Sequence, residues 1–304
     1  MATTTKAAAP AKKSGFQGVK AAWIILVICA CAGYGVWYFV MGNPDNFVGG
    51  DRSGHPANLL GTVYKGGFVV GLILTLLFTV ICLGIERFFA IKTASGKMNL
   101  AKFTAEVKSA IKAQDFAKAK DLCNKMQGTV GNVVMASINM YQTVETDDTL
   151  KKAAKIAKIQ QAHEEATQLE MPTLQMNMPM VATIVSLGTL TALFGTVLGM
   201  IGSFQALSAG GGADSMALSA GISEALVNTA SGILTSWVAT VVYNFFSNKI
   251  DKLTYALDEI GFTISATYDS NHNEAYSLTI FFNALKAFRE WLKLRYRKKT
   301  SGLT

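Results

Sequence analysis

One segment of the chain places ionisable and hydroxyl side chains in an almost wholly apolar setting. From Met171 to Asn248 there are 78 residues and only two charged side chains, Asp214 and Glu224. Residues that recur every three or four positions share one face of a helix. The face that begins at Glu224 continues with Asn228, Ser231 and Thr235. Polar groups inside a bilayer are costly and usually face a bundle interior or a water path, so this pattern indicates a functional polar surface.

Glu224 is the most informative of these residues. Neither neighbouring apolar segment offers a Lys or Arg to pair with it, so its carboxylate must be hydrated, protonated or paired with another chain. Asp214 lies in a glycine-rich stretch, where simple solvation explains it. We therefore expect a functional role for Glu224 and none for Asp214.

The hydroxyl residues of this region allow two interpretations. Thr189, Thr196 and Ser203 recur at seven-residue intervals, and Gly195 and Gly199 would allow a second helix to approach closely. Small and hydroxyl side chains are ordinary packing devices between membrane helices, so packing competes with function at four positions, namely Thr189, Ser203, Ser231 and Thr235. A second small or polar face of the last apolar segment carries Thr229, Gly232, Ser236, Thr240 and Tyr243.

Four apolar segments are long enough to cross a bilayer and would position these residues. They cover residues 21–41, 66–85, 180–207 and 225–247. Of the 28 Lys and Arg residues, all but Arg52 and Lys65 lie in segments that four alternating crossings place on one side. By the positive-inside rule that side is the cytoplasm, so we expect both termini to be cytoplasmic.

The remaining segments follow from these crossings. We expect a basic cytoplasmic tail at 1–20, a periplasmic loop at 42–65, a cytoplasmic helical insert at 86–179, a short periplasmic loop and the start of the last span at 208–224, and a cytoplasmic tail at 248–304. Within the insert, Met98–Met126 has the apolar spacing of an amphipathic helix or helical hairpin. A break is expected at Gln127–Gly131 and a helix start at Asp148 and Thr149. No stretch alternates as a strand would, so the predicted fold class is all-α.

Two segments keep alternative interpretations. The first span follows basic residues and contains Ala30-Cys31-Ala32, which resembles the cleavage site of a signal peptide ending at residue 32. Its apolar character continues to Met41, which favours an uncleaved anchor. The tail interleaves aromatic and basic residues between Phe281 and Lys299, which suits either an anionic lipid surface or the protein's own helical bundle better than nucleic acid.

Composition indicates neither a metal site nor an enzyme. The four cysteines, Cys29, Cys31, Cys82 and Cys123, form no CxxC pair and are interpreted as small apolar residues or free thiols. The three histidines lie far apart in the sequence. No nucleophile–base pair or phosphate-binding loop is present, so we expect no cofactor.

Three ordered blocks resemble the MotA/TolQ/ExbB proton-channel family, and most of all its ExbB branch. The blocks are Leu193–Phe204 (LFGTVLGMIGSF), Gly221–Gly232 (GISEALVNTASG) and Val242–Phe246 (VYNFF). The resemblance implies three transmembrane helices with cytoplasmic extensions, here the spans at 66–85, 180–207 and 225–247. The span at 21–41 is an addition to that plan.

The resemblance also implies partners and site residues. Five subunits would surround a pore that holds the transmembrane helices of an ExbD-like, single-span partner, in the inner membrane of a Gram-negative bacterium. Thr196 and Thr229 match the family's pore-lining threonines, and Glu224 matches its glutamate at the periplasmic end of the last span. Helical geometry places Thr229 about 140° from Glu224, so an ideal helix cannot turn both toward one pore.

The function implied is a motor subunit that uses the proton motive force to drive a TonB-like protein in transport across the outer membrane. A TolQ-like or gliding-type envelope motor is the alternative within the family. A non-conducting scaffold is the alternative outside it, and a solute transporter is disfavoured because internal repeats are absent.

Overall fold

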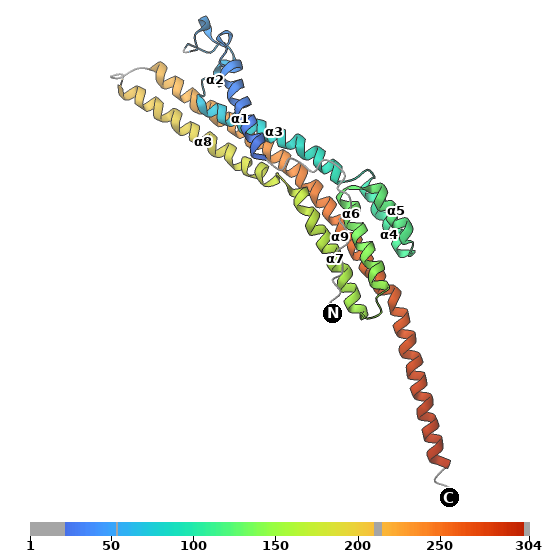
Figure 1. Cartoon of the computed structure of the whole chain (residues 1–304). Coiled ribbons are helices and arrows are strands. Elements are labelled where there is room, and N and C mark those ends of the chain that lie inside the picture. Colours follow the sequence, from blue (N-terminus) through green and yellow to red (C-terminus); the bar gives the residue numbers. More distant parts are fainter. Residues whose placement is uncertain (1–21, 53, 210–214, 301–304) are drawn as a thin grey trace, which may run out of the picture. The chain divides into compact units, whose positions relative to one another are not determined.

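The computed structural model describes residues 22–52, 54–209 and 215–300, and these are helical almost throughout (Figure 1). No strand occurs in these ranges, where the only extended pairing is an isolated bridge between Phe47 and Pro56. The predicted all-α fold class is thereby confirmed. The basic tail predicted at 1–20 lies outside the described residues.

The chain divides into two compact units, which we describe separately. Of the described residues, those within 22–94 and 171–252 form the span unit, and those within 95–170 and 253–300 form the insert unit. Four helical segments are long and apolar enough to cross a membrane, and they confirm the number of spans predicted. They cover Trp23–Met41, Phe68–Ala94, Met178–Gln205 and Leu218–His272.

The span unit begins with helix α1 (Ala22–Gly35), which continues through a π-helical segment at Val36–Met41. Helix α1 packs on α3 (Phe68–Ala94) through small residues. A Cβ atom added to Gly33 would lie 2.8 Å from the Thr75 backbone nitrogen, and one added to Gly71 would lie 2.6 Å from the Tyr34 ring. Close backbone approach of this kind is how membrane helices gain van der Waals contact. The extra N-terminal span is therefore an integral part of the unit.

The connection predicted as a loop at 42–65 is partly helical. It contains short 3-10 turns at Pro44–Asn46 and Val48–Gly50 and helix α2 (Leu59–Tyr64). Its core is the buried Asn46, whose amide nitrogen donates to the Val40 and Met41 carbonyls at 2.8 and 2.9 Å. These bonds tie the connection to the end of the first span.

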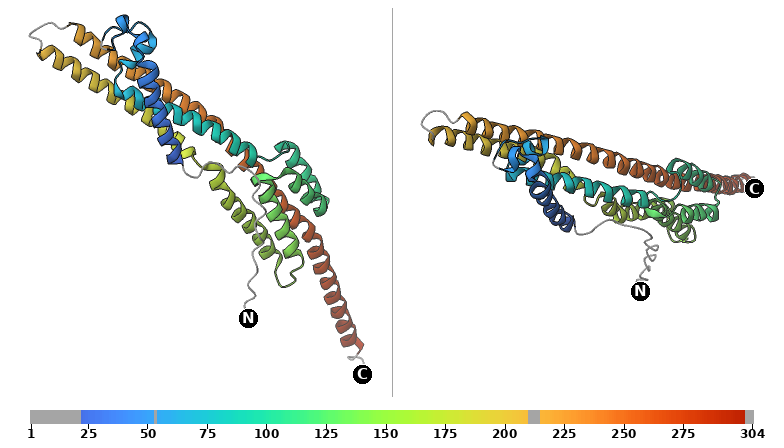
Figure 2. Two further views of the ribbon diagram at one scale, coloured as in Figure 1. Left: turned by 45° about the horizontal axis from the view of Figure 1, so that its top comes forward. Right: turned by 90° about the horizontal axis from the view of Figure 1, so that it is seen from above.

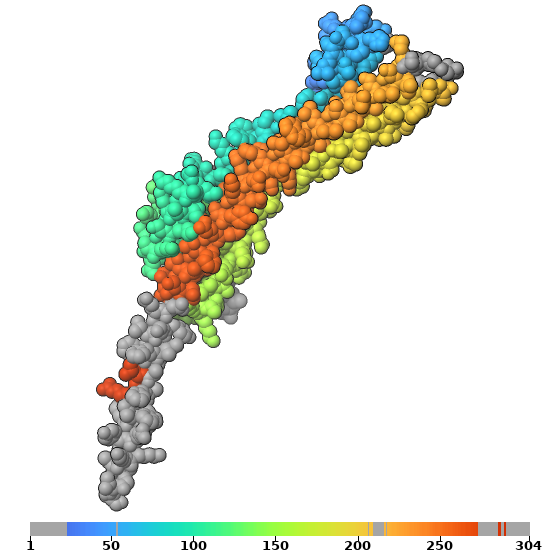
Figure 3. Space-filling model, turned by 180° about the vertical axis from the view of Figure 1, so that it is seen from behind, coloured from blue at the N-terminus to red at the C-terminus, as the bar shows by residue number. Residues whose placement is uncertain are grey.

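Helices α8 (Met178–Ala209) and α9 (Ser215–Thr300) lie side by side and antiparallel in the span unit (Figure 2). Their surfaces adjoin along the unit in the space-filling view, where α8 is yellow and α9 orange (Figure 3). A buried apolar cluster joins α3, α8 and α9 and consists of Leu76, Val80, Ile184 and Ala239. Helix α9 already begins at Ser215, so much of the connection predicted at 208–224 is helical; Asp214 lies outside the described residues.

The entry to α8 is a break rather than a kink within one helix. Helix α7 (Lys152–Gln175) contains Pro172 and ends at Gln175, and Asn177 adopts a left-handed conformation with φ of 64° before α8 begins. Pro179 is the second residue of α8, a position where its missing N–H costs no helical hydrogen bond. Pro179 therefore lies at the restart of the helix, whereas Pro172 lies within α7.

The insert unit is a bundle of α4 (Leu100–Lys112), α5 (Phe116–Met126), α6 (Gly128–Glu145), and parts of α7 and α9. The hairpin alternative for 98–126 is the one observed, with Gln114 in the left-handed region at its turn. The break predicted at 127–131 is confined to Gln127 and Gly128, which have φ of 56° and 68°. Helix α7 starts later than predicted, because Asp147 accepts hydrogen bonds from the Thr149 backbone and hydroxyl and closes a turn there.

Helix α9 continues through the C-terminal tail to Thr300. The tail is therefore helical up to that residue. Of the side chains that would make it amphipathic, only Leu285, Lys286 and Arg289 are described, so the proposed lipid-binding face lies mostly outside the described residues.

Candidate functional site

Small residues let α8 and α9 approach closely, and this seam positions most of the predicted site. A Cβ atom added to Gly188 would lie 2.5 Å from the Ser236 hydroxyl oxygen, and one added to Gly195 would lie 2.7 Å from the Asn228 amide carbon. Gly199 meets the Gly221 backbone in the same way. The Gly195-xxx-Gly199 spacing therefore acts as a helix-packing device, as the sequence indicated.

The Thr196 and Thr229 hydroxyls meet across this seam. Their Oγ1 atoms lie 2.5 Å apart. Each hydroxyl is also within hydrogen-bonding distance of a carbonyl one turn earlier in its own helix, Thr196 at 2.9 Å from Ala192 and Thr229 at 3.0 Å from Ala225. Both side chains are half-buried. The two threonines that the family resemblance singled out thus form one polar site.

The number of hydroxyl hydrogens in the Thr196–Thr229 pair determines which further hydrogen bonds the pair can make. A hydroxyl has one hydrogen to donate and two lone pairs to accept with. With two hydrogens in total, one bridges the two oxygens and the other bonds to a backbone carbonyl. Lone pairs remain free, so the pair can accept a hydrogen bond from a protonated carboxyl group or from water.

Other predicted residues also lie on the seam. Thr189 lies 2.9 Å from Ser236, oxygen to oxygen. Ser203 is fully buried and donates to the carbonyls of Gly199 at 2.9 Å and Leu218 at 3.4 Å. The Thr189–Ser236 and Ser203–Leu218 contacts join α8 to α9, which is what the packing interpretation of these hydroxyls predicts.

Glu224, Asn228, Ser231 and Thr235 occupy a different face of α9 from Thr229. The Glu224 carboxylate lies against Gly67, directly before α3, where an added Cβ atom would be 2.6 Å from its Oε1. Asn228 and Thr235 are completely buried, and Ser231 is half-buried with its carbonyl accepting from the Thr235 hydroxyl at 3.0 Å. The polar stripe therefore faces the interior of the span unit, with Glu224 beside α3 and Asn228 against Gly195 of α8, whereas the half-buried Thr229 meets Thr196. The conflict posed by the 140° separation is resolved by two distinct polar surfaces.

Helix α3 contains a buried ion pair that was not predicted from the sequence. Arg87 is 0% exposed, and it pairs through Nη2 with Glu86 Oε1 at 2.5 Å. Its Nη1 donates to the Thr173 and Leu174 carbonyls at 3.3 and 3.5 Å, and the Asn177 amide donates to Glu86 at 3.3 Å. The adjacent opposite charges at the end of an apolar span were the available signal. This Glu86–Arg87 clamp fixes the break between α7 and α8.

The span unit exposes large apolar side chains on both helices of the seam. Those at least half exposed on α8 include Phe194 and Val197, and those on α9 include Ile233, Leu234 and Trp237. Contiguous apolar surfaces of this kind mark contact with lipid or with another protein. The surfaces flanking the hydroxyl pair are therefore suited to a membrane assembly.

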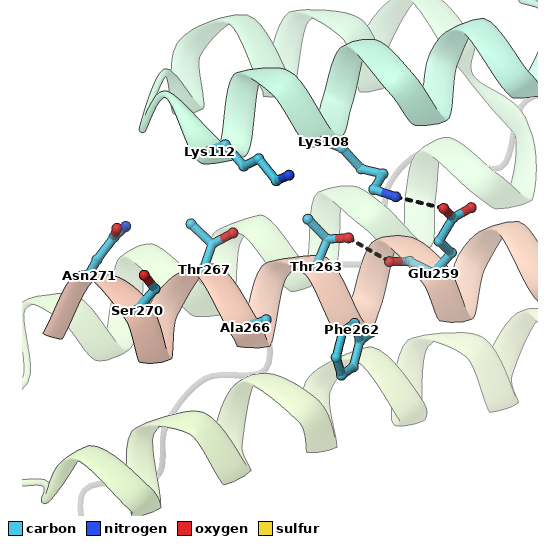
Figure 4. Close-up of a pocket in the computed structure, with 9 residues that line it drawn as sticks. All are labelled: Lys108, Lys112, Glu259, Phe262, Thr263, Ala266, Thr267, Ser270 and Asn271. Atoms are coloured by element: carbon cyan, nitrogen blue, oxygen red, sulfur yellow. Dashed lines mark hydrogen bonds and ion pairs between the residues drawn. The ribbon is translucent and has the colours of Figure 1, made fainter. Parts of the chain in front are cut away.

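The insert unit contains a polar groove of about 580 Å³ between α4 and α9 (Figure 4). The Lys108 ammonium pairs with Glu259 at 2.6 Å, while the Lys112 ammonium extends toward α9, where Thr263, Thr267 and Asn271 line the groove. Because Lys108 is already neutralised by Glu259, the groove concentrates little positive charge. We assign it no function.

The cysteines are free thiols, as predicted. Cys29 of α1 and Cys82 of α3 lie 3.6 Å apart, sulfur to sulfur. Burial raises the pKa of Cys123 in the insert unit to about 12, which leaves an unreactive thiol. Among the described residues, no group of three or more His, Cys, Asp or Glu side chains could hold a metal ion.

Part of the chain is similar to known proteins. Residues 129–259 match the model of the MotA/TolQ/ExbB proton channel family. Relatives include the putative biopolymer transport protein ExbB-like 3 of Synechocystis, 31% identical over 37% of this chain and 55% of its own length. The Tol-Pal system protein TolQ of Haemophilus influenzae is 34% identical over 29% of this chain and 39% of its own length. The biopolymer transport protein ExbB of Salmonella typhimurium is 33% identical over 26% of this chain and 32% of its own length.

The chain thus covers about half the length of the Synechocystis relative and less than half the length of the other two. The matched region contains α8, the part of α9 up to residue 259, the hydroxyl pair and Glu224. With four helices long and apolar enough to span a membrane, this chain is a multi-pass membrane protein whose residues 129–259 are similar to the MotA/TolQ/ExbB proton channel family.

Proposed function

We propose that this protein is the channel subunit of an inner-membrane motor that converts the proton motive force into work on a TonB-like protein through an ExbD-like, single-span partner. The observation that carries the proposal is the Thr196–Thr229 hydroxyl pair on the α8–α9 seam. Several copies would surround the partner's transmembrane helix, with the pentamer of the family as the expected state. Both termini would lie in the cytoplasm, the side that receives nearly all Lys and Arg residues.

The mechanism follows from the free lone pairs of this pair. A protonated carboxyl group on the partner's helix could donate to the threonine oxygens and would lose that bond on deprotonation. Each proton that crosses about 100 mV releases about 2.3 kcal/mol. Several protons would therefore be needed for substantial conformational work. Glu224, beside the start of α3, would tune proton entry from the periplasm.

The experiment that tests this proposal replaces Thr196 by Val and, separately, Glu224 by Gln in the full complex. We expect both variants to assemble and to lose proton-driven transport, because each removes a proton-handling group with little change in volume. Thr240→Val is the matched control, since the Thr240 hydroxyl donates only to the Ser236 carbonyl of its own helix. Transport at the wild-type level in both test variants would overturn the proposal.

A TolQ-like envelope motor is the second candidate. It is favoured by the two TolQ relatives, from Haemophilus influenzae and Pseudomonas aeruginosa, at 34% and 31% identity. The two candidates share the channel and differ in the protein driven. Deleting the chain distinguishes them, because the first predicts failure of energised uptake and the second predicts a leaky outer membrane.

A further inference from the structure

The side-chain amide of Asn228 is fully buried and makes no hydrogen bond. No other side-chain amide in the described part of the span unit is in this situation. It is 0% exposed, and neither its Oδ1 nor its Nδ2 atom has a hydrogen-bond partner. An unpaired polar group is costly in an apolar medium, where no bulk water can replace the missing partner. The amide can donate two hydrogen bonds and accept two. A polar partner that fits this interior position is therefore required.

The surroundings of Asn228 limit what that partner can be. Its side chain lies against Gly195 of α8, where even an added Cβ atom would come within 2.7 Å. The other polar residues of its stripe do not reach it, since the Thr235 hydroxyl donates to the Ser231 carbonyl at 3.0 Å. The amide faces the packed interior, so a side chain from another protein cannot contact it unless α8 and α9 separate. Water is the polar molecule small enough for such a position.

The position of Asn228 relates this water to the two groups that are proposed to handle protons, Glu224 and the Thr196–Thr229 pair. Glu224 lies one helical turn earlier on the same face of α9, about 6 Å along the axis. Thr229 is the next residue, and Thr196, its hydroxyl partner at 2.5 Å, directly follows the Gly195 that Asn228 contacts. Along α9, Asn228 thus lies between Glu224, one turn earlier, and Thr229 of the hydroxyl pair.

We propose that Asn228 binds internal water that connects Glu224 to the Thr196–Thr229 pair and delivers protons to it. The role in proton delivery rests on the proposed function, whereas the bound water does not. A proton leaving the Glu224 carboxylic acid bonds to a water oxygen while one of that water's own protons passes to a threonine oxygen. The threonine in turn releases its hydroxyl proton to the acceptor in the pore. The amide orients the water and neither gains nor loses a proton.

The direct test is solid-state NMR of the full complex in lipid bilayers, with the chain labelled by ¹⁵N-asparagine. Transfer of magnetisation from water to the Asn228 side-chain nitrogen is expected at short mixing times, and an Asn228→Leu sample assigns the signal. Asn46 is the internal control, because it is buried and its Nδ2 atom already donates to two carbonyls, so its signal should build up more slowly. An Asn228 signal no faster than that of Asn46 would overturn the bound water.

The functional arm measures proton flux in proteoliposomes that contain the complex. Asn228→Leu and the smaller Asn228→Ala should each lower the flux by at least about tenfold, since a positioned proton relay contributes on that order or more. Wild-type flux in both, with flux abolished in Thr196→Val, would refute the relay and leave the proposed function intact. Wild-type flux in all three variants would instead refute the proposed function.

Discussion

At the scale of single residues, the structure separates two kinds of polar group that the sequence presents together. Thr196 and Thr229 meet on the seam, where their free lone pairs can bind a proton donor. Glu224 and Asn228 lie on the interior face of α9, against α3 and α8. A helical wheel predicts their angular separation but not the neighbour of each face. That is why the sequence left Glu224 and Thr229 in apparent conflict.

His163 of α7 provides a residue-scale prediction about pH. Its ring is buried beside Gly261, Nδ1 lies 2.9 Å from the Ser137 hydroxyl, and burial lowers its pKa despite the opposing effects of Asp258 and Glu164. Below its ordinary pKa of about 6.5 the unfolded chain binds a proton that the folded chain lacks. The stability contributed by neutral His163 is therefore complete above that pH and is lost as the pH falls toward the lowered value.

The measurement is hydrogen exchange of α6 and α7 in the purified protein, followed by mass spectrometry at pH 7.5 and 5.5 after correction for the intrinsic exchange rate. Protection of these helices should drop at the lower pH. His163→Gln cannot titrate and should remove the difference. An equal drop in the wild-type protein and the variant would assign the effect to other groups.

At the scale of helices, the fold depends on close approach between α8 and α9. The sequence predicted the spans, an amphipathic helix or helical hairpin at 98–126, and the close-packing glycines, because each depends on local periodicity or composition. It could not predict the Glu86–Arg87 clamp, since Arg87 bonds to carbonyls 86 and 87 residues away. Nor could it predict that Asn228 packs on Gly195, which depends on how two helices rotate against each other.

Two glycines of α8 form a matched pair that tests the seam. An added methyl group at Gly195 would collide with Asn228, whereas nothing lies within 4 Å of the same position at Gly202. Gly195→Ala should therefore lower the stability of the protein by about 1–3 kcal/mol, the usual cost of overpacking. Gly202→Ala should be neutral or slightly stabilising, because Ala favours a helix over Gly. Denaturant unfolding in mild detergent gives both values, and equal losses would contradict the close contact at Gly195.

A single and a double substitution test the Glu86–Arg87 clamp at the start of α8. Arg87→Met leaves the buried Glu86 without its cation, which typically costs about 3–5 kcal/mol. Adding Glu86→Gln removes the uncompensated charge and should recover part of that loss. The same unfolding measurement applies, and a double variant no more stable than Arg87→Met would show that the charge pair is not the source of the effect.

At the scale of the whole molecule, the span unit has the properties of one member of an assembly. Its seam helices expose apolar side chains such as Phe194 and Trp237 beside the half-buried hydroxyl pair. The pair can accept a proton-bearing group, but the described part of the span unit places no carboxyl group of its own there. A partner helix with an acidic side chain would complete the site. The sequence indicated this assembly through its resemblance to a family, because a single chain does not specify its partners.

The most direct test of this account is the native mass of the complex purified from its own membranes in mild detergent, with each component identified. The account predicts a homo-oligomer, with a pentamer expected from the family, that holds a small single-span protein with an acidic residue in its span. A homo-oligomer that never recruits such a protein would leave the hydroxyl pair without a proton donor. That result would contradict the motor and favour a non-conducting scaffold.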